Sequence, residues 1–76
     1  MTHQEQIAQA IIELVNAERQ AQWCRCQAYE SNRLGEEERR KNYMDVARLW
    51  AEDAEKAQAK LARLGIPMNA EVLTAA

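Results

Sequence analysis

Two apolar stripes of equal length run through this chain and mirror each other about Gly35. Within each stripe, apolar residues recur at alternating spacings of three and four, which keeps their side chains on one face of an α-helix. The first stripe comprises Ile7, Ala10, Leu14, Ala17, Ala21, Cys24 and Ala28, and the second comprises Tyr43, Ala47, Trp50, Ala54, Ala57, Leu61 and Leu64. Such spacing over about four heptads is typical of a coiled coil. The sequence therefore predicts an all-α fold, an antiparallel two-helix hairpin with coiled-coil-like packing.

Local signals mark the ends of both helices. Thr2 followed by Glu5 predicts a capping box, in which the two side chains satisfy the first free backbone N–H groups. Gly35 and Gly65 are suited to the left-handed conformation that closes a helix, and Pro67 cannot continue one. We expect one domain, 1–76, with helix 1 at about 3–33, a turn at about 34–36, helix 2 at about 37–64 and a tail at 65–76. The tail either adds one turn, capped by Asn69, over the open end or is disordered.

Folding at Gly35 brings large residues of one stripe opposite small residues of the other. The expected pairs are Ile7 with Leu64, Leu14 with Ala57, Ala21 with Trp50, and Ala28 with Tyr43. Large-to-small matching of this kind fills the space between two closely packed helices.

A single hairpin of this size is expected to need a second copy. At 76 residues the core supplies only a few kcal/mol, and a two-helix layer covers one side of each stripe. Apolar residues also lie outside the stripes, where they widen the apolar face. We expect five of them to form the seam of a homodimer, or of a higher even oligomer, with four-helix-bundle packing: Ile12, Val15, Cys26, Val46 and Leu49. The alternative is that part of this surface docks another protein.

Trp23 is the strongest candidate for a functional side chain. The mirror relation puts Arg48 across from it, and Arg19 lies one turn behind it. An indole between two guanidinium groups can be a cation–π stack that orders the surface. It can also anchor a partner protein, because Trp and Arg are enriched in binding hot spots. A third interpretation is an aromatic shelf with positive clamps for a nucleotide or another anionic ring.

The sequence lacks the residue sets that catalysis or metal binding requires. It contains one His, and its two cysteines, Cys24 and Cys26, point about 200° apart on a helix, which prevents a bond between them. It has no Ser/His/Asp or Cys/His arrangement, no glycine-rich phosphate loop and no zinc-ligand spacing. We therefore expect a non-enzymatic protein without a metal or another cofactor.

Net charge and hydropathy bear on partners and location. A net charge of −2 and a pI near 5.4 favour a protein partner over the phosphate backbone of nucleic acid. The first residues lack the pattern of a signal peptide, and no apolar run approaches the ~18 residues of a membrane span. A cytoplasmic protein without a membrane partner is expected. On the surface, the spacing predicts i,i+4 ion pairs from Glu36 to Arg40 and from Glu37 to Lys41.

The hairpin plan and the opening Met1-Thr2-x-Gln4-Glu5 resemble the Rop family of small plasmid-encoded RNA-binding proteins. The resemblance implies a four-helix bundle of two hairpins and RNA binding along helix 1, where this chain offers Arg19 and Arg25 as cations. Without a reactive cluster, the surplus apolar surface favours a protein-binding adaptor, regulator or inhibitor. In size and composition the chain also resembles accessory proteins of bacteriophages and mobile elements that block host machinery.

Overall fold

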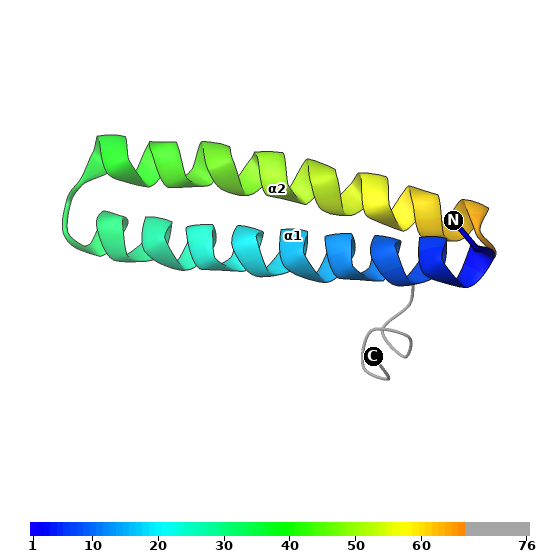
Figure 1. Ribbon diagram of the computed structural model, residues 1–76. Coiled ribbons are helices and arrows are strands. Elements are labelled where there is room, and N and C mark those ends of the chain that lie inside the picture. Colours follow the sequence, from blue (N-terminus) through cyan, green and yellow to red (C-terminus); the bar gives the residue numbers. More distant parts are fainter. Residues whose placement is uncertain (67–76) are drawn as a thin grey trace.

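A computed structural model describes residues 1–66, which form two long antiparallel helices lying side by side (Figure 1). Helix α1 spans His3–Arg33 and helix α2 spans Glu37–Arg63. The described residues contain no strand. The Cα positions extend 48 × 21 × 14 Å, the dimensions of a layer one helix thick. The all-helical, two-helix hairpin is confirmed, and α2 ends at Arg63 where an end at about 64 was expected. The expected turn capped by Asn69 lies outside the described residues.

The capping box at the start of α1 forms in part. The N–H of Glu5 donates to Thr2 Oγ1 at 3.1 Å, as the motif requires. The carboxylate of Glu5 accepts from the Thr2 hydroxyl at 3.0 Å, where the motif predicts the backbone N–H of Thr2 as its donor. Because the two side chains bind each other, only one of the free N–H groups is satisfied by this pair.

Both helices end in the same way, with a glycine in the left-handed region. Gly35 has φ +75° and Gly65 has φ +88°. After α1, the N–H of Glu36 donates to the carbonyl of Ser31 at 2.8 Å, and after α2 that of Ile66 donates to the carbonyl of Leu61 at 2.9 Å. In a Schellman motif, such a hydrogen bond joins the N–H of the sixth residue to the carbonyl of the first. It satisfies a carbonyl that the helix end leaves free.

Small side chains fill the contact between the helices. The two predicted stripes are buried over most of their length, and four of their residues, Ile7, Tyr43, Trp50 and Leu64, are half-buried. Among residues 1–66, two large side chains are fully buried, Leu14 and Leu61. The buried set contains one residue that the apolar pattern omits, Ser31, which continues the spacing of the first stripe by three. The core residues are Ala10, Leu14, Ala17, Ala21, Cys24, Ala28, Ala47, Ala54, Ala57 and Leu61.

The central core cluster agrees with the predicted register. Its six buried members are both residues of three mirror pairs about the turn: Ala10 and Leu61, Leu14 and Ala57, and Ala17 and Ala54. Trp50 packs against this cluster and borders the same groove as Ala17, whereas the mirror relation alone places it at Ala21. Ile66 also packs against the cluster and extends the core beyond α2.

Candidate binding surfaces

Several large apolar side chains lie outside the contact between the helices. Trp23 is 54% exposed and Leu49 is 59% exposed, although each lies well inside a long helix. An apolar surface that remains in water on a small chain marks a site of contact with another molecule. The exposed large apolar residues are Met1, Ile12, Val15, Trp23, Tyr29, Leu34, Met44, Val46 and Leu49.

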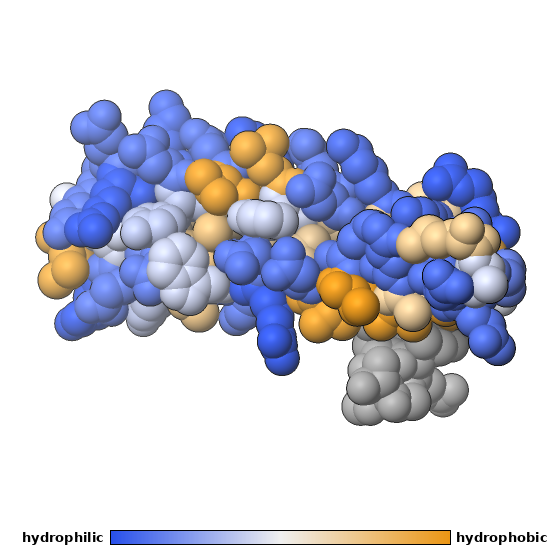
Figure 2. Space-filling model, in the orientation of Figure 1, coloured by the Kyte–Doolittle hydropathy of each residue, from blue (hydrophilic) through white to orange (hydrophobic). Residues whose placement is uncertain are grey.

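One side of the hairpin carries aromatic residues from both helices. The rings of Trp23 on α1 and Tyr43 on α2 meet edge to face, with centroids 5.8 Å apart and planes at 79°. Val46 and Trp50 follow Tyr43 at i+3 and i+7, so they lie on the same side of α2, and Leu49 lies at its outer edge. We call these five residues the aromatic face. Figure 2 shows this side, where pale aromatic surface spans both helices beside orange apolar surface.

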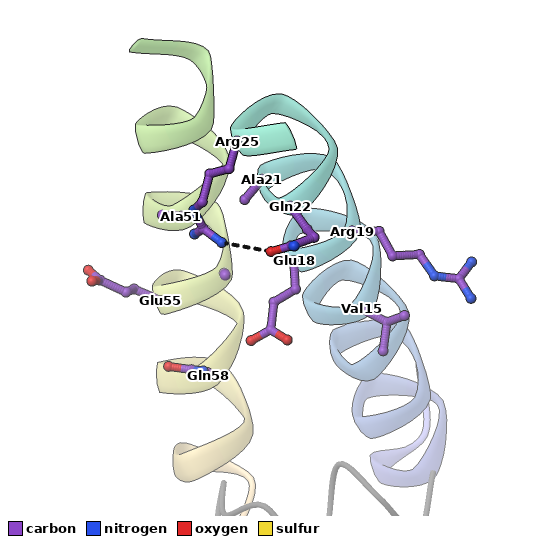
Figure 3. A pocket seen from close by; sticks show the side chains of 10 residues that line it. Val15, Glu18, Arg19, Ala21, Gln22, Arg25, Ala51, Glu55 and Gln58 are labelled. Carbon is purple, nitrogen blue, oxygen red and sulfur yellow. Dashed lines mark hydrogen bonds between the residues drawn. The ribbon is translucent and has the colours of Figure 1, made fainter. Parts of the chain in front are cut away.

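The opposite side of the hairpin carries a groove of about 640 Å³ along the contact between the helices, with charged and amide side chains along an alanine floor (Figure 3). Glu18, Gln22 and Arg25 of α1 lie along it, and Arg25 Nη1 donates to Gln22 Oε1 at 3.4 Å. Its floor is formed by small side chains, so the groove is open. We call this side the groove face. The lining residues are Val15, Glu18, Arg19, Ala21, Gln22, Arg25, Ala51, Ala54, Glu55 and Gln58.

Trp23, Arg19 and Arg48 do not form the predicted cluster. Trp23 contacts Tyr43, whereas Arg48 comes five residues after Tyr43, about 140° around α2, and pairs with Asp45 at 3.2 Å. The guanidinium of Arg19 points away from α2 and makes no hydrogen bond or ion pair within residues 1–66 (Figure 3). The expected stack of Trp23 against Arg48 is therefore wrong, because the mirror relation matches the level of two residues but not the side on which they lie.

The five residues expected in the dimer seam are exposed, but they do not share one side. Val15 borders the groove face, whereas Val46 and Leu49 belong to the aromatic face. Ile12 and Cys26 are two full heptads apart on the side of α1 that faces away from α2. One flat interface cannot bury all five residues. The residues that line the groove face with Val15, above all Glu18, Arg25 and Glu55, were not expected in the seam.

Carboxylates on the same helix neutralise most arginines near the turn. Arg39 pairs with Glu36 at 3.2 Å and Arg40 with Glu37 at 2.6 Å, both at i,i+3 spacing, so the predicted i,i+4 pairs are wrong. Arg33 pairs with Glu30 in the same way. The hydrogen bond from Arg33 lowers the pKa of Glu30, and that bond raises the pKa of Arg33. Each of these three arginines therefore has a carboxylate beside it on the protein surface.

The two cysteines occupy different environments. Cys24 is buried in the core, as the first stripe predicts, and Cys26 is exposed; both are free thiols. Among residues 1–66, no three His, Cys, Asp or Glu side chains gather in a way that could hold a metal ion. Neither α1 nor α2 carries an apolar stretch long enough to cross a bilayer.

Comparison of the chain with family models, with curated proteins and with solved structures found no match. The candidate surfaces are therefore defined by the geometry of this chain alone.

Proposed function

We propose that this protein is a non-enzymatic, homodimeric helical module that acts in the cytoplasm by binding another protein. The hairpin packs as half of a four-helix bundle, and the aromatic face binds the partner. In this proposal the protein serves as an adaptor, regulator or inhibitor, and blocking of host machinery by a phage or mobile-element accessory protein is one such role.

The edge-to-face pair of Trp23 and Tyr43 carries this proposal. It joins the two helices on the outside of the hairpin, holds the indole in a fixed orientation and still leaves 54% of Trp23 exposed. Val46 and Leu49 extend the apolar surface beside it. Rigid, half-exposed aromatic side chains with apolar neighbours are the usual anchors of protein interfaces, because their burial costs little side-chain entropy.

The distribution of charge supports a protein partner over RNA. Four arginines of the turn half, Arg33, Arg39, Arg40 and Arg48, each pair with a carboxylate three residues earlier. Binding of a phosphate backbone would have to break these pairs. An affinity that falls steeply with added salt and is competed by polyanions would therefore replace this proposal with RNA or anionic-ligand binding.

The proposal is tested by affinity capture from cells that encode the protein, followed by mass spectrometry. The wild-type chain and two alanine variants serve as baits: Trp23→Ala removes the anchor, and Tyr29→Ala removes an exposed aromatic ring outside the aromatic face. We expect one partner to be retained by the wild type and by Tyr29→Ala but lost with Trp23→Ala. For the purified pair, loss of the anchor should weaken binding by about 2 kcal/mol or more. Equal capture by all three baits would exclude the aromatic face.

A further inference from the structure

The groove face has a charge pattern that is unfavourable within one hairpin. The mirror pairs of the core fix the level at which the helices pass each other, and one of these pairs is Ala17 with Ala54. Glu18 follows Ala17 and Glu55 follows Ala54, so the two carboxylates lie within one helical turn of each other, and both line the groove. Seven residues along, Arg25 follows the buried Cys24, and Arg48 follows the buried Ala47 on the same side of the hairpin, where it pairs with Asp45 at 3.2 Å. On this side, Glu18 therefore lies near Glu55 and Arg25 lies near Arg48.

We propose that a second copy of the chain docks on the groove face, turned end for end, and that these four charges set its orientation. The inference rests on the proposed homodimer and specifies its geometry. With a two-fold axis midway between the Glu18 and Arg25 levels, α1 lies on α1 of the partner and α2 lies on α2. Arg25 then meets Glu18 of the second copy, and Arg48 meets its Glu55. The four charges then form four attractive pairs between hairpins, two of which compete with the pair of Arg48 and Asp45 within each chain.

The alternative dimer, with both turns at the same end, is disfavoured by the same charges. There α1 lies on α2 of the second copy, and residues at equal levels meet. Arg25 would face Arg48, and Glu18 would face Glu55. Like charges in contact select against this orientation, so the pattern both favours one dimer and opposes the other.

The shape of the groove face suits close approach of a second copy. Ala21, Ala51 and Ala54 form its floor near the proposed axis, and such small side chains let two helices come close together. Most of the face of 48 by 21 Å overlaps in this dimer, an area comparable to the ~800 Å² per partner of a stable interface. The aromatic face stays free.

Cysteine cross-linking tests the orientation. In the Cys24→Ala/Cys26→Ala chain, Gln22→Cys places a thiol on the groove face next to the axis, and Gln20→Cys is the matched control on the opposite side of α1. Mild oxidation should link Gln22→Cys to its own copy and leave Gln20→Cys unlinked. Ala51→Cys should also link to its own copy, because α2 lies on α2.

Three outcomes would overturn the inference. If Gln22→Cys links only when mixed with Ala51→Cys, the two turns lie at the same end. If Gln20→Cys links efficiently, the hairpins meet through the opposite side. In both cases the homodimer stands and only its geometry is wrong. If the unmodified chain is a monomer by light scattering, the proposed homodimer itself fails.

Charge reversal gives an independent test in solution. Arg25→Glu and Glu18→Arg should each raise the dimer dissociation constant by roughly tenfold or more, because each places like charges at two symmetric contacts. The double variant restores opposite charges and should return the constant to near the wild-type value. Equal weakening by the double variant would refute the pairing. Circular dichroism should show unchanged helicity, since the groove is exposed.

Discussion

Removal of one buried leucine should destabilise the protein far more than removal of an exposed one. Leu61 is 0% exposed, whereas Leu49 is 59% exposed, and both lie on α2. Replacement by Ala removes three carbon groups, worth about 0.8 kcal/mol each when fully buried, or about 2.4 kcal/mol for Leu61. The cavity left behind adds to this, so Leu61→Ala should cost about 2.5–4 kcal/mol. For Leu49→Ala, the cost should stay below about 1 kcal/mol.

Urea unfolding, followed by circular dichroism at one fixed protein concentration, measures this difference. The concentration must be held constant because dimerisation contributes to the apparent stability. With a urea dependence of about 1 kcal/mol per molar, the two midpoints should differ by about 2 M. Leu61→Ala is expected to unfold partly even without urea, because eight of the ten core residues described are Ala or Cys, which leaves little reserve of stability. Equal midpoints for the two variants would refute the assignment of Leu61 to the core and of Leu49 to the surface.

Three further predictions concern the turn and the thiols. Replacement of Gly35 by Ala should cost about 1 kcal/mol through backbone strain alone, because its φ is +75° and no atom lies within 4 Å of the added Cβ; an unchanged Tm would contradict this. The pairing with Arg33 lowers the pKa of Glu30, so the stability that it contributes is present above the ordinary carboxyl pKa and is lost as the pH falls through the lowered value. By NMR titration, Arg33→Gln should return the pKa of Glu30 to its ordinary range. A thiol reagent should modify Cys26 rapidly in the native protein and reach Cys24 only on unfolding, since Cys26 is exposed and Cys24 is buried; slow reaction of both thiols would place Cys26 in an interface.

The sequence predicts the two helices and their buried apolar stripes because both depend on local periodicity. Alternating three- and four-residue spacing fixes which residues face the other helix, and the two glycines fix where each helix ends. Ser31 shows the limit of an apolar pattern. It occupies the next position of the first stripe and is buried, but a polar residue does not register in a search for apolar side chains.

The sides of the hairpin were harder to predict than its core. In an antiparallel pair, the residue before a buried position on one helix shares its side with the residue before a buried position on the other. Trp23 precedes Cys24 and therefore lies on the side of Val46, which precedes Ala47, while Arg48 follows Ala47. This rule assigns a residue to the aromatic face or to the groove face. The mirror relation gives only the level of a residue along the helix, so it does not distinguish the two faces. The seven-residue spacing of Glu18 and Arg25 places both residues on one side of α1, so the sequence itself indicates the groove face.

The molar mass of the purified protein tests the central claim, that one hairpin is half of a larger bundle. Light scattering coupled to size exclusion at micromolar concentration should give twice the 8.7 kDa of the chain, or a higher even multiple, with helical circular dichroism. Dilution should lower the mass and the helicity together, because small side chains dominate the core of a single hairpin. A well-folded monomer of 8.7 kDa would contradict the account.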